Sequence, residues 1–317
     1  MLTKFTPNRI LFAIVAIALV LFPFVTDSRT WTILLTQIFI FAILAMSYDI
    51  LLGYTGIVSF GHAMFFGIGA YTTAIMLKRI DATLFNFLLS IVVGMIIAGI
   101  VSFIIGLLTL RLQSHFFAMF TLAVSGLFLV LAEKWRTLTY GNDGFTFKAP
   151  ELFTDRTNFY LFSLLCLGIV FLLLRLLVNS PFGSVLMSVK DNEMRSLALG
   201  FKSIYYKVTA SVVAGVAASV AGSLYVVSLR FVNTSVMAID MTLNALLMTI
   251  IGGVGTLIGP AIGAAIIELA QHNLSNLAKT YAIFERWIIF FGIIYILAVI
   301  FFPKGIVGTL REKLAKR

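Results

Sequence analysis

Residues 82–110 read ATLFNFLLSIVVGMIIAGIVSFIIGLLTL, a run without a single charged side chain. A helix needs about 20 mostly apolar residues to cross the hydrocarbon core of a bilayer, so this run is long enough to span it. Further stretches free of Asp, Glu, Lys and Arg flank it on both sides, at 10–26, 30–48, 50–77, 116–132, 157–174, 208–229, 241–267 and 287–303. The sequence therefore predicts an all-α, polytopic transmembrane helical bundle with about 9–10 membrane segments.

The composition of the whole chain agrees with a lipid environment. Hydrophobic residues make up 61% of the chain and charged residues 11%, against roughly 45–50% and about 25% in soluble domains. The mean hydropathy is +1.07. The net charge of +10 comes from Lys and Arg between the apolar runs, which is typical of cytoplasmic loops, so no nucleic-acid partner is expected. The one cysteine, Cys166, lies in an apolar run, which excludes a disulfide framework.

The distribution of basic residues predicts the orientation. The connector 175–207 and the tail after Pro303 are rich in Lys and Arg, so both are expected on the cytoplasmic side, together with the N-terminus. The loop 133–156 carries both signs of charge and is expected on the opposite side. The first apolar run is followed by no small-residue cleavage site, so we interpret it as a retained helix.

Two of the apolar runs, 50–77 and 241–267, are long and interrupted by glycine, which weakens a helix by roughly 1 kcal/mol relative to alanine. The pairs Gly53-x-x-Gly56 and Gly252-x-x-Gly255 occupy equivalent places in two halves that run in the same direction. We expect a single transmembrane domain over 1–317. Its predicted parts are repeat one at about 9–111, an inserted helix pair at about 112–178, a cytoplasmic helix at 180–200, repeat two at about 204–303 and a basic tail at 304–317. The glycines fit close helix packing and equally fit helices broken beside a solute path.

Polar residues accompany these interruptions at membrane depth, where they are costly and tend to be functional. The candidate substrate path consists of Gly53, Tyr54, Thr55, Gly56, Ser59, Gly61, His62, Gly252, Gly253 and Gly255. His62 also fits a purely structural hydrogen bond to a carbonyl of the broken helix. Ser59 with His62 suggests an intramembrane protease, but the GxSxG motif is missing. Asp49 is equally consistent with a path residue and with an interfacial group at a helix end.

Residues 180–200 have the pattern of a short amphipathic helix. Ser180 suits the N-cap, Pro181 the first helical position and Gly200 the stop. Such a helix lies in the lipid interface or docks into a groove on a partner protein. The few basic residues and the acids among them favour docking.

Several catalytic signatures are missing from the sequence. It contains no GxxxxGK[ST] phosphate loop, no HExxH and no carboxylate cluster. The chain is therefore not expected to be an enzyme, to hydrolyse nucleotide or to bind a metal or cofactor. Uphill transport would draw on an ion gradient or on another subunit, and intramembrane acids suited to ion coupling are few.

Six stretches, in order, resemble LivM-type permeases of the branched-chain amino-acid ABC importer family. They are Gly53–Tyr71, Arg111–Leu122, Leu138–Gly144, Ser180–Gly200, Gly252–Pro260 and Phe302–Gly308. The resemblance implies a permease subunit of an ATP-driven importer in the bacterial cytoplasmic (inner) membrane, translocating branched-chain amino acids or a related small polar solute. The chain departs from the family at Ser184 and Ser188, where arginines are frequent, and at Tyr140, where a small residue is usual.

The resemblance also implies partners. These are a second, homologous LivH-type permease, two ABC ATPase subunits that bind the ATP and Mg, and an extracytoplasmic solute-binding protein. The ATPase-coupling residues would be Ser180, Pro181, Phe182, Gly183, Lys190, Asp191, Asn192, Glu193, Ala198, Leu199 and Gly200. The alternatives are a urea or amide ABC permease and an ATP-independent channel or ion-coupled carrier.

Overall fold

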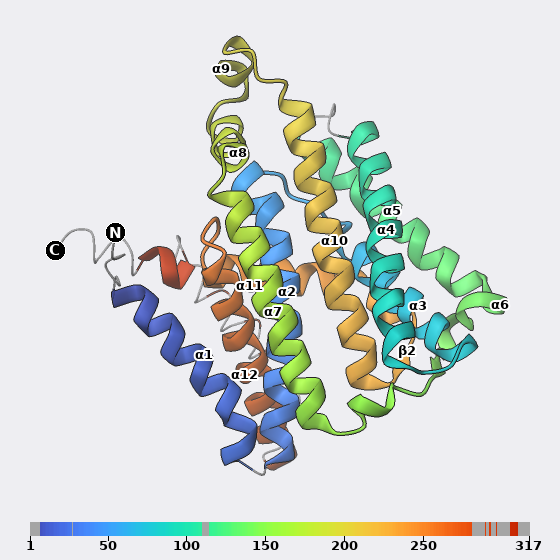
Figure 1. Ribbon diagram of the computed structural model, residues 1–317. Coiled ribbons are helices and arrows are strands. Elements are labelled where there is room, and N and C mark those ends of the chain that lie inside the picture. The colour runs from blue at the N-terminus through green and yellow to red at the C-terminus, as the bar shows by residue number, and fades with distance from the viewer. Residues whose placement is uncertain are drawn as a thin grey trace.

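The computed structural model is an all-α membrane bundle (Figure 1), which confirms the predicted fold class. It describes residues 7–26, 28–109, 114–280 and 305–309, with 289, 292 and 296. The longer helices are α1 (Pro7–Val25), α2 (Arg29–Thr55), α3 (His62–Arg79), α4 (Leu84–Thr109), α5 (Ser114–Lys134), α7 (Arg156–Val178), α8 (Pro181–Asp191), α10 (Ser203–Leu229), α11 (Ile239–Gly252) and α12 (Ile258–Thr280). Five of the described helices, α2, α4, α5, α7 and α10, are long and apolar enough to cross a membrane. The predicted return helix at 287–303 lies outside the described residues, except for 289, 292 and 296.

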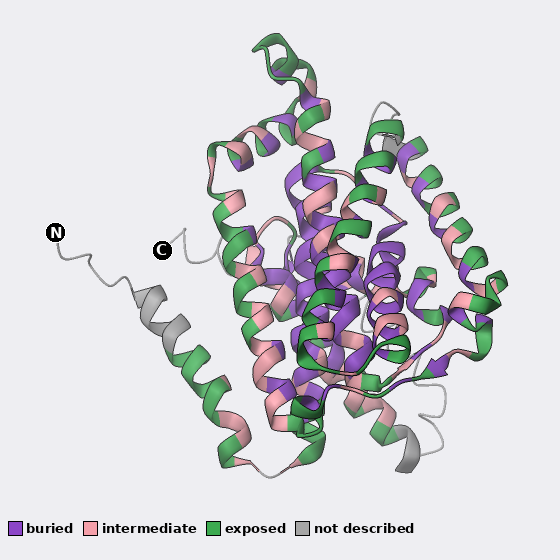
Figure 2. Cartoon of the chain, turned by 45° about the vertical axis from the view of Figure 1, so that its right-hand side comes forward, coloured by how far each residue is buried: buried purple, intermediate pink, exposed green. Residues whose placement is uncertain are grey.

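Two helices form the centre of the bundle. In an 18-residue apolar segment of each helix, 83% of the residues are buried in α2 and 61% in α10. The corresponding share is 33% in α4 and 17% in α7. Figure 2 shows this as a buried centre surrounded by helices with exposed sides. The outer helices expose large apolar side chains such as Phe85, Leu108 and Leu176. That surface suits contact with lipid, where apolar exposure carries no penalty.

The two predicted halves pack across each other. α3 and α4 of the first half lie against α10 of the second, and α12 of the second half lies against α2 of the first. A hydrogen bond from Ser223 Oγ to the Gly69 carbonyl oxygen, 3.2 Å, joins α10 to α3. The halves therefore share one core and do not form separate bundles.

The two ends of the bundle carry different small elements. At one end stand α8 and α9 (Glu193–Ala198), above α2 and α10 (Figure 1). At the other end β1 (Phe145–Thr146) pairs antiparallel with β2 (Phe231–Val232), in the register Phe145↔Val232. The remaining short elements are α6 (Arg136–Thr139), η1 (Gly141–Asp143), η2 (Glu151–Phe153) and η3 (Thr234–Met237). The basic connector and the mixed-charge loop thus lie at opposite ends.

The prediction of one continuous helix over 180–200 is wrong, because the chain forms α8 and α9 with a break at Asn192. Asn192 has an extended backbone, with φ −158° and ψ 100°, and its side chain accepts a hydrogen bond from the Arg195 amide at 2.8 Å. Asparagine offers such a local acceptor, which favours a new helix start over continuation of the old helix.

Candidate functional site: two glycine breaks and the adjoining α8 and α9

The first break separates α2 from α3. α2 ends at Thr55, and Gly56 adopts the left-handed conformation with φ 72°. Residues 56–61 then run without helix until α3 begins at His62. Glycine adopts this backbone without steric cost, so its position determines where α2 stops.

The second break separates α11 from α12. α11 ends at Gly252, and the chain turns through Gly253 (φ 128°) and Gly255 (φ 77°) before α12 begins at Ile258. Leu257 also has a positive φ of 55°. A branched, non-glycine residue in this region costs on the order of 1–3 kcal/mol and persists only where its surroundings hold it.

Asp49 of α2 connects the two breaks. Its side chain is fully buried. Oδ1 accepts a hydrogen bond from the Gly255 amide at 2.7 Å, and Oδ2 accepts one from the Leu257 amide at 3.0 Å. The carboxylate of the first half thus holds the strained turn of the second half in place. Asp49, which the sequence left undecided between two roles, bonds the backbone inside the bundle.

Gly53 permits this contact by its lack of a side chain. A Cβ at position 53 would lie 2.6 Å from the Gly255 nitrogen and would also overlap the Asp49 carboxylate. The two glycine breaks that the sequence placed in equivalent positions therefore touch each other directly.

Lys190 of α8 reaches the same place from outside the bundle. Its ammonium donates to the Gly53 carbonyl oxygen at 2.7 Å, and its charge also acts on Asp49. The side-chain stem passes Gly56, where a Cβ would meet Lys190 Cγ at 3.2 Å. The sequence assigned Lys190 to partner contact. Within this chain it donates a hydrogen bond to the first break.

Other polar groups fix the first break internally. The Tyr48 hydroxyl donates to the Ser59 carbonyl oxygen at 3.1 Å. Ser47 Oγ lies 2.7 Å from His62 Nε2 and donates to the Leu44 carbonyl oxygen at 2.6 Å. The other ring nitrogen of His62, the buried Nδ1, has no partner among the described residues. His62 therefore pairs with Ser47, and no hydrogen bond joins it to Ser59, so the Ser59–His62 pair that the sequence suggested does not form.

The helix ends at the breaks are already paired. The Ala63 amide at the start of α3 donates to Thr242 Oγ1 at 2.8 Å, and the Gly259 amide of α12 donates to Thr256 Oγ1 at 2.9 Å. In this conformation protein groups therefore occupy these two amides. Thr121 Oγ1 of α5 accepts from the Phe60 amide at 3.2 Å, so the inserted pair also contacts the first break.

The predicted path residues lie together around these contacts. Gly53, Tyr54, Thr55, Ser59, Gly61, His62, Gly252 and Gly253 are buried, Gly255 is half-buried and Gly56 is exposed. Tyr54 packs in a cluster with Met46, Ile50 and Leu186 of α8. In the described part of the chain, no group of three His, Cys, Asp or Glu side chains is arranged to hold a metal ion.

α8 begins as the sequence predicted. Ser180 Oγ accepts from the Gly183 amide at 3.4 Å, and Pro181 occupies the first turn. Gly183 is packed so closely that a Cβ would collide with the backbone of Val178 in α7. The ring centroids of Phe182 and of Tyr206 in α10 lie 5.3 Å apart. One face of α8 is therefore fixed to α7 and α10, while the other face, with Asp191, is exposed.

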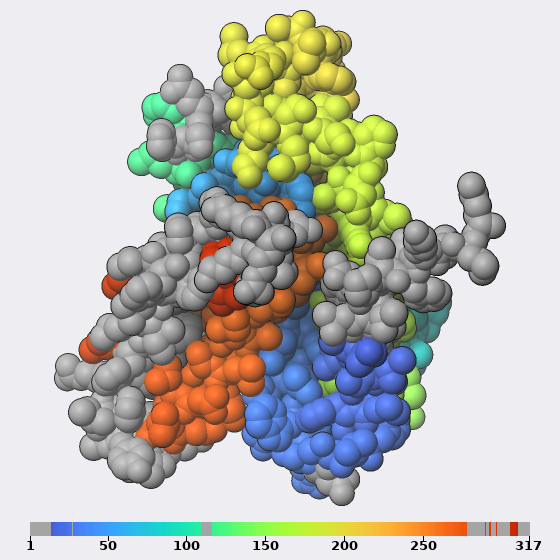
Figure 3. Space-filling model, turned by 90° about the vertical axis from the view of Figure 1, so that its left-hand side faces the viewer, coloured from blue at the N-terminus to red at the C-terminus, as the bar shows by residue number. Residues whose placement is uncertain are grey.

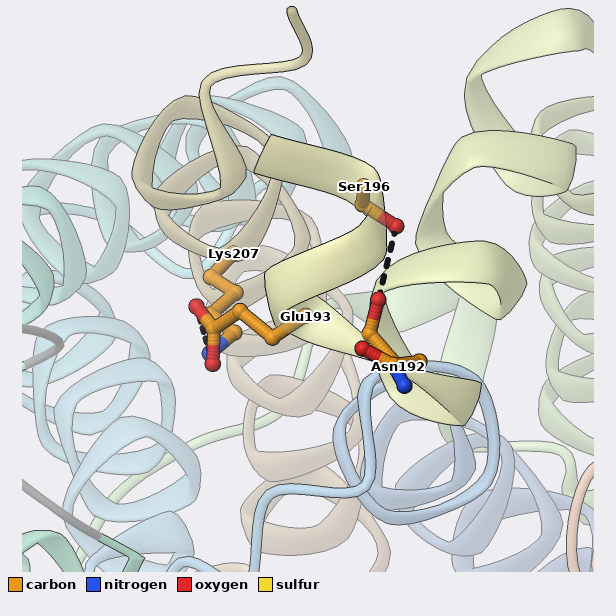
Figure 4. A network of polar contacts seen from close by, with 4 residues as sticks. All are labelled: Asn192, Glu193, Ser196 and Lys207. Carbon is orange, nitrogen blue, oxygen red and sulfur yellow. Dashed lines mark hydrogen bonds and ion pairs between the residues drawn. The ribbon is translucent and has the colours of Figure 1, made fainter. Parts of the chain in front are cut away.

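α9 extends beyond α8 and is held by a small polar network (Figure 4). Ser196 Oγ donates to the Asn192 carbonyl oxygen at 3.1 Å, and Lys207 Nζ donates to Glu193 Oε1 at 2.7 Å. Partial burial opposes ionisation of Glu193, but hydrogen bonds from Lys207 and Ser203 and the Lys207 charge outweigh it, so the pKa of Glu193 lies below its usual value.

The surface of α9 and the turn after it is exposed and apolar. Met194 is 76% and Leu199 71% exposed, and Leu197 and Phe201 are also exposed. Ala198 and Gly200 of the predicted coupling set lie on the same exposed turn, with Gly200 at φ 89°. Apolar side chains grouped beyond the end of a bundle are typical of an interaction surface.

Comparison with known proteins gives a consistent result. Residues 31–299 match the family model described as branched-chain amino acid transport system / permease component. Two curated relatives are named high-affinity branched-chain amino acid transport system permease protein LivM. The one from Salmonella typhimurium is 22% identical over 96% of this chain and 76% of its own length. The one from Escherichia coli is 23% identical over 98% of this chain and 77% of its own.

A third relative comes from Methanocaldococcus jannaschii and is named a probable branched-chain amino acid transport permease protein LivM. It is 22% identical over 84% of this chain and 90% of its own length. No solved structure matches the chain.

Proposed function

Because this chain belongs to the family of branched-chain amino acid transport system permease components, we propose that it is one membrane subunit of an ATP-driven importer. The importer carries branched-chain amino acids, or a related small polar solute, across the cytoplasmic membrane. A second, homologous permease completes the translocation path, and two ATPase subunits bind and hydrolyse ATP with Mg. An extracytoplasmic solute-binding protein delivers the solute. Both chain termini face the cytoplasm.

The contact between Lys190 and Gly53 is the observation that carries this proposal. α8 and α9 lie outside the long helices and expose apolar side chains suited to a protein partner. Lys190 of α8 bonds the Gly53 carbonyl oxygen, and Asp49, one turn earlier in α2, bonds the Gly255 and Leu257 amides. A movement of α8 therefore acts on both breaks through three hydrogen bonds.

This arrangement suggests how a motor on another chain drives transport. ATP-dependent closure of the two ATPases pushes α8 and α9, and the push reaches the breaks through Lys190. Broken helices accommodate such rearrangement with little cost, because glycine permits several backbone conformations. The two permeases then alternate between outward-open and inward-open states around the breaks.

Reconstitution into vesicles tests the proposal. The chain is co-purified with its second permease and ATPases, and leucine uptake is measured with the binding protein on the outside. We expect uptake that requires ATP inside the vesicle and ceases when the ATPases are made hydrolysis-deficient. Uptake that continues without ATPase activity supports the ATP-independent channel or carrier instead. Competition by urea or amides, but not by leucine, supports the related solute class.

A further inference from the structure

A polar cavity of about 360 Å³ lies between α2, α10, α11 and α12. On α12 it is lined by residues further along the helix than its start at the second break. Its described polar lining consists of Gln37, Tyr225, Asn244, Glu268, Gln271, His272, Ser275 and Asn276. Glu268, Gln271 and His272 follow the i, i+3, i+4 spacing, so they share one face of α12. Figure 3 shows the face of the molecule where α12 lies beside the N-terminal helices.

Glu268 is the unusual member of this lining. The residue is 8% exposed, near the middle of α12. Within the part of the chain that the structure describes, its carboxylate makes neither a hydrogen bond nor an ion pair. An acid at membrane depth is costly and is retained where it serves transport or binding. A buried, unpaired carboxylate directed at a polar cavity therefore indicates a missing positive partner.

The rest of the lining specifies which positive partner fits. None of the described residues around the cavity is a lysine or arginine, so the negative charge is not compensated locally. Gln37, Asn244 and Gln271 offer amide oxygens that accept hydrogen bonds. A primary ammonium group donates three hydrogen bonds in different directions, which matches one carboxylate surrounded by amide oxygens.

The position of the cavity connects it to the breaks. α2 contributes Gln37 to the cavity and Asp49 to the breaks, and α12 starts at the second break and carries Glu268 further along. At a rise of about 1.5 Å per residue, Gln37 and Asp49 are separated by roughly 18 Å along α2. The cavity and the breaks thus occupy two levels of the same α2–α12 interface.

We propose that Glu268 and its amide neighbours form a binding subsite for the primary ammonium group of the transported amino acid, occupied before the solute reaches the glycine breaks. This inference rests on the proposed function, because it takes the solute to be an amino acid. The breaks themselves contribute no free carboxylate, since Asp49 is already bonded to two amides.

Chemical modification of the wild-type complex tests the subsite directly. The transporter is reconstituted with phosphatidylcholine and phosphatidylglycerol, which lack primary amines, so that no lipid supplies a primary ammonium group. Dicyclohexylcarbodiimide labelling of Glu268 is followed by mass spectrometry. We expect leucine to slow labelling at least about fivefold, and its deaminated analogue 4-methyl-2-oxopentanoate to leave it unchanged. Equal protection by both compounds, or by neither, overturns the proposal.

Substitution gives a second measurement. Glu268→Gln keeps the shape and removes the charge, so we expect ATP-dependent leucine uptake to fall at least tenfold. Glu268→Asp retains the charge and should recover part of the uptake. The matched control is Asn273→Ala, a polar, exposed residue of the same helix that does not line the cavity. Uptake by Glu268→Gln at the wild-type rate overturns the subsite, whereas absence of uptake by wild type overturns the importer itself.

Discussion

At the scale of single residues, Gly53 determines how closely the two breaks approach. A methyl group at this position would lie 2.6 Å from the Gly255 nitrogen. We expect Gly53→Ala to separate the breaks, to lower the stability of the complex by about 1–3 kcal/mol as overpacking does, and to reduce uptake strongly. Thermal unfolding of the purified complex and vesicle uptake measure the two effects.

The control for Gly53→Ala is Gly168→Ala in α7, where no atom beyond the adjoining residues and backbone of α7 lies within 4 Å of the added Cβ. Alanine there should leave uptake unchanged and stabilise α7 slightly, because it is the better helix former. Equal behaviour of the two variants would show that contact between the breaks is unimportant.

Asp49 provides the complementary test from the acceptor side. In Asp49→Asn one carboxylate oxygen becomes an amide donor, which faces the donating amide of either Gly255 or Leu257. An unsatisfied buried donor costs about 1–3 kcal/mol, so we expect a lower unfolding temperature and reduced uptake. Asp81→Asn, at an exposed position, is the control. Wild-type stability in Asp49→Asn would argue against Asp49 as the link between the breaks.

The sequence could locate the breaks but not their connection. The glycine spacing predicted Gly53 and Gly255 at equivalent places, because backbone freedom is a local property. The bond between Asp49 and Gly255 joins residues more than two hundred positions apart, and no local pattern encodes it. Its nearest sequence signal is an acid one helical turn before the first glycine of a break. Glu268 directly follows the apolar run 241–267 in the sequence, but its lack of a partner among the described residues follows only from packing.

At the scale of elements, α8 and α9 show where periodicity is insufficient. Ser180, Pro181 and Gly200 predicted the start and the stop of the segment 180–200. The apolar spacing shifts between Val189 and Met194, which is consistent with two helices, and Asn192 is the residue whose side chain caps the second one. The break at Asn192 thus sets the direction of α9, and with it the positions of Met194 and Leu199.

The link from α8 to the breaks predicts a specific defect. Lys190→Met keeps most of the side-chain stem but removes the donor to the Gly53 carbonyl oxygen. We expect ATP hydrolysis to continue while uptake per ATP falls about fivefold or more, because movement of α8 no longer reaches the breaks. Lys202→Met, an exposed position in the same connector, is the control. An unchanged ratio of uptake to hydrolysis in Lys190→Met would contradict the proposed transmission.

The Glu193–Lys207 pair makes the order of α9 depend on pH. The pKa of Glu193 is lower in the folded protein than in the unfolded chain, so its stabilising effect is present above the unfolded value and is lost as the pH falls through the folded value. A nitroxide at Leu199→Cys, in a Cys166→Ser background, should become more mobile over that acidic range. With Glu193→Gln added, mobility should be high at every pH. A pH response that persists in Glu193→Gln would assign it to another group.

At the scale of the whole molecule, the helices that precede the glycine breaks in the two predicted repeats differ in length. α2 and α11 each precede a glycine break, yet α2 spans Arg29–Thr55 and α11 only Ile239–Gly252. The sequence predicts the order of the membrane segments, because each apolar run is recognised from its own local composition. It does not recover that α12 packs on α2 and α3 on α10, because apolar helices in lipid lack a patterned face that would specify their neighbours.

The shared core has a consequence for assembly. Asp49 joins both breaks of this chain into one unit. In the proposed importer that unit forms one wall of the path, and the second permease supplies the opposite wall. We therefore expect native mass spectrometry of the purified importer to show one copy of this chain, one homologous permease and two ATPases. The chain expressed without the second permease should insert into the membrane but give no leucine uptake in vesicles. Uptake by this chain and the ATPases alone, or a complex with two copies of this chain, would contradict a path built between two different permeases.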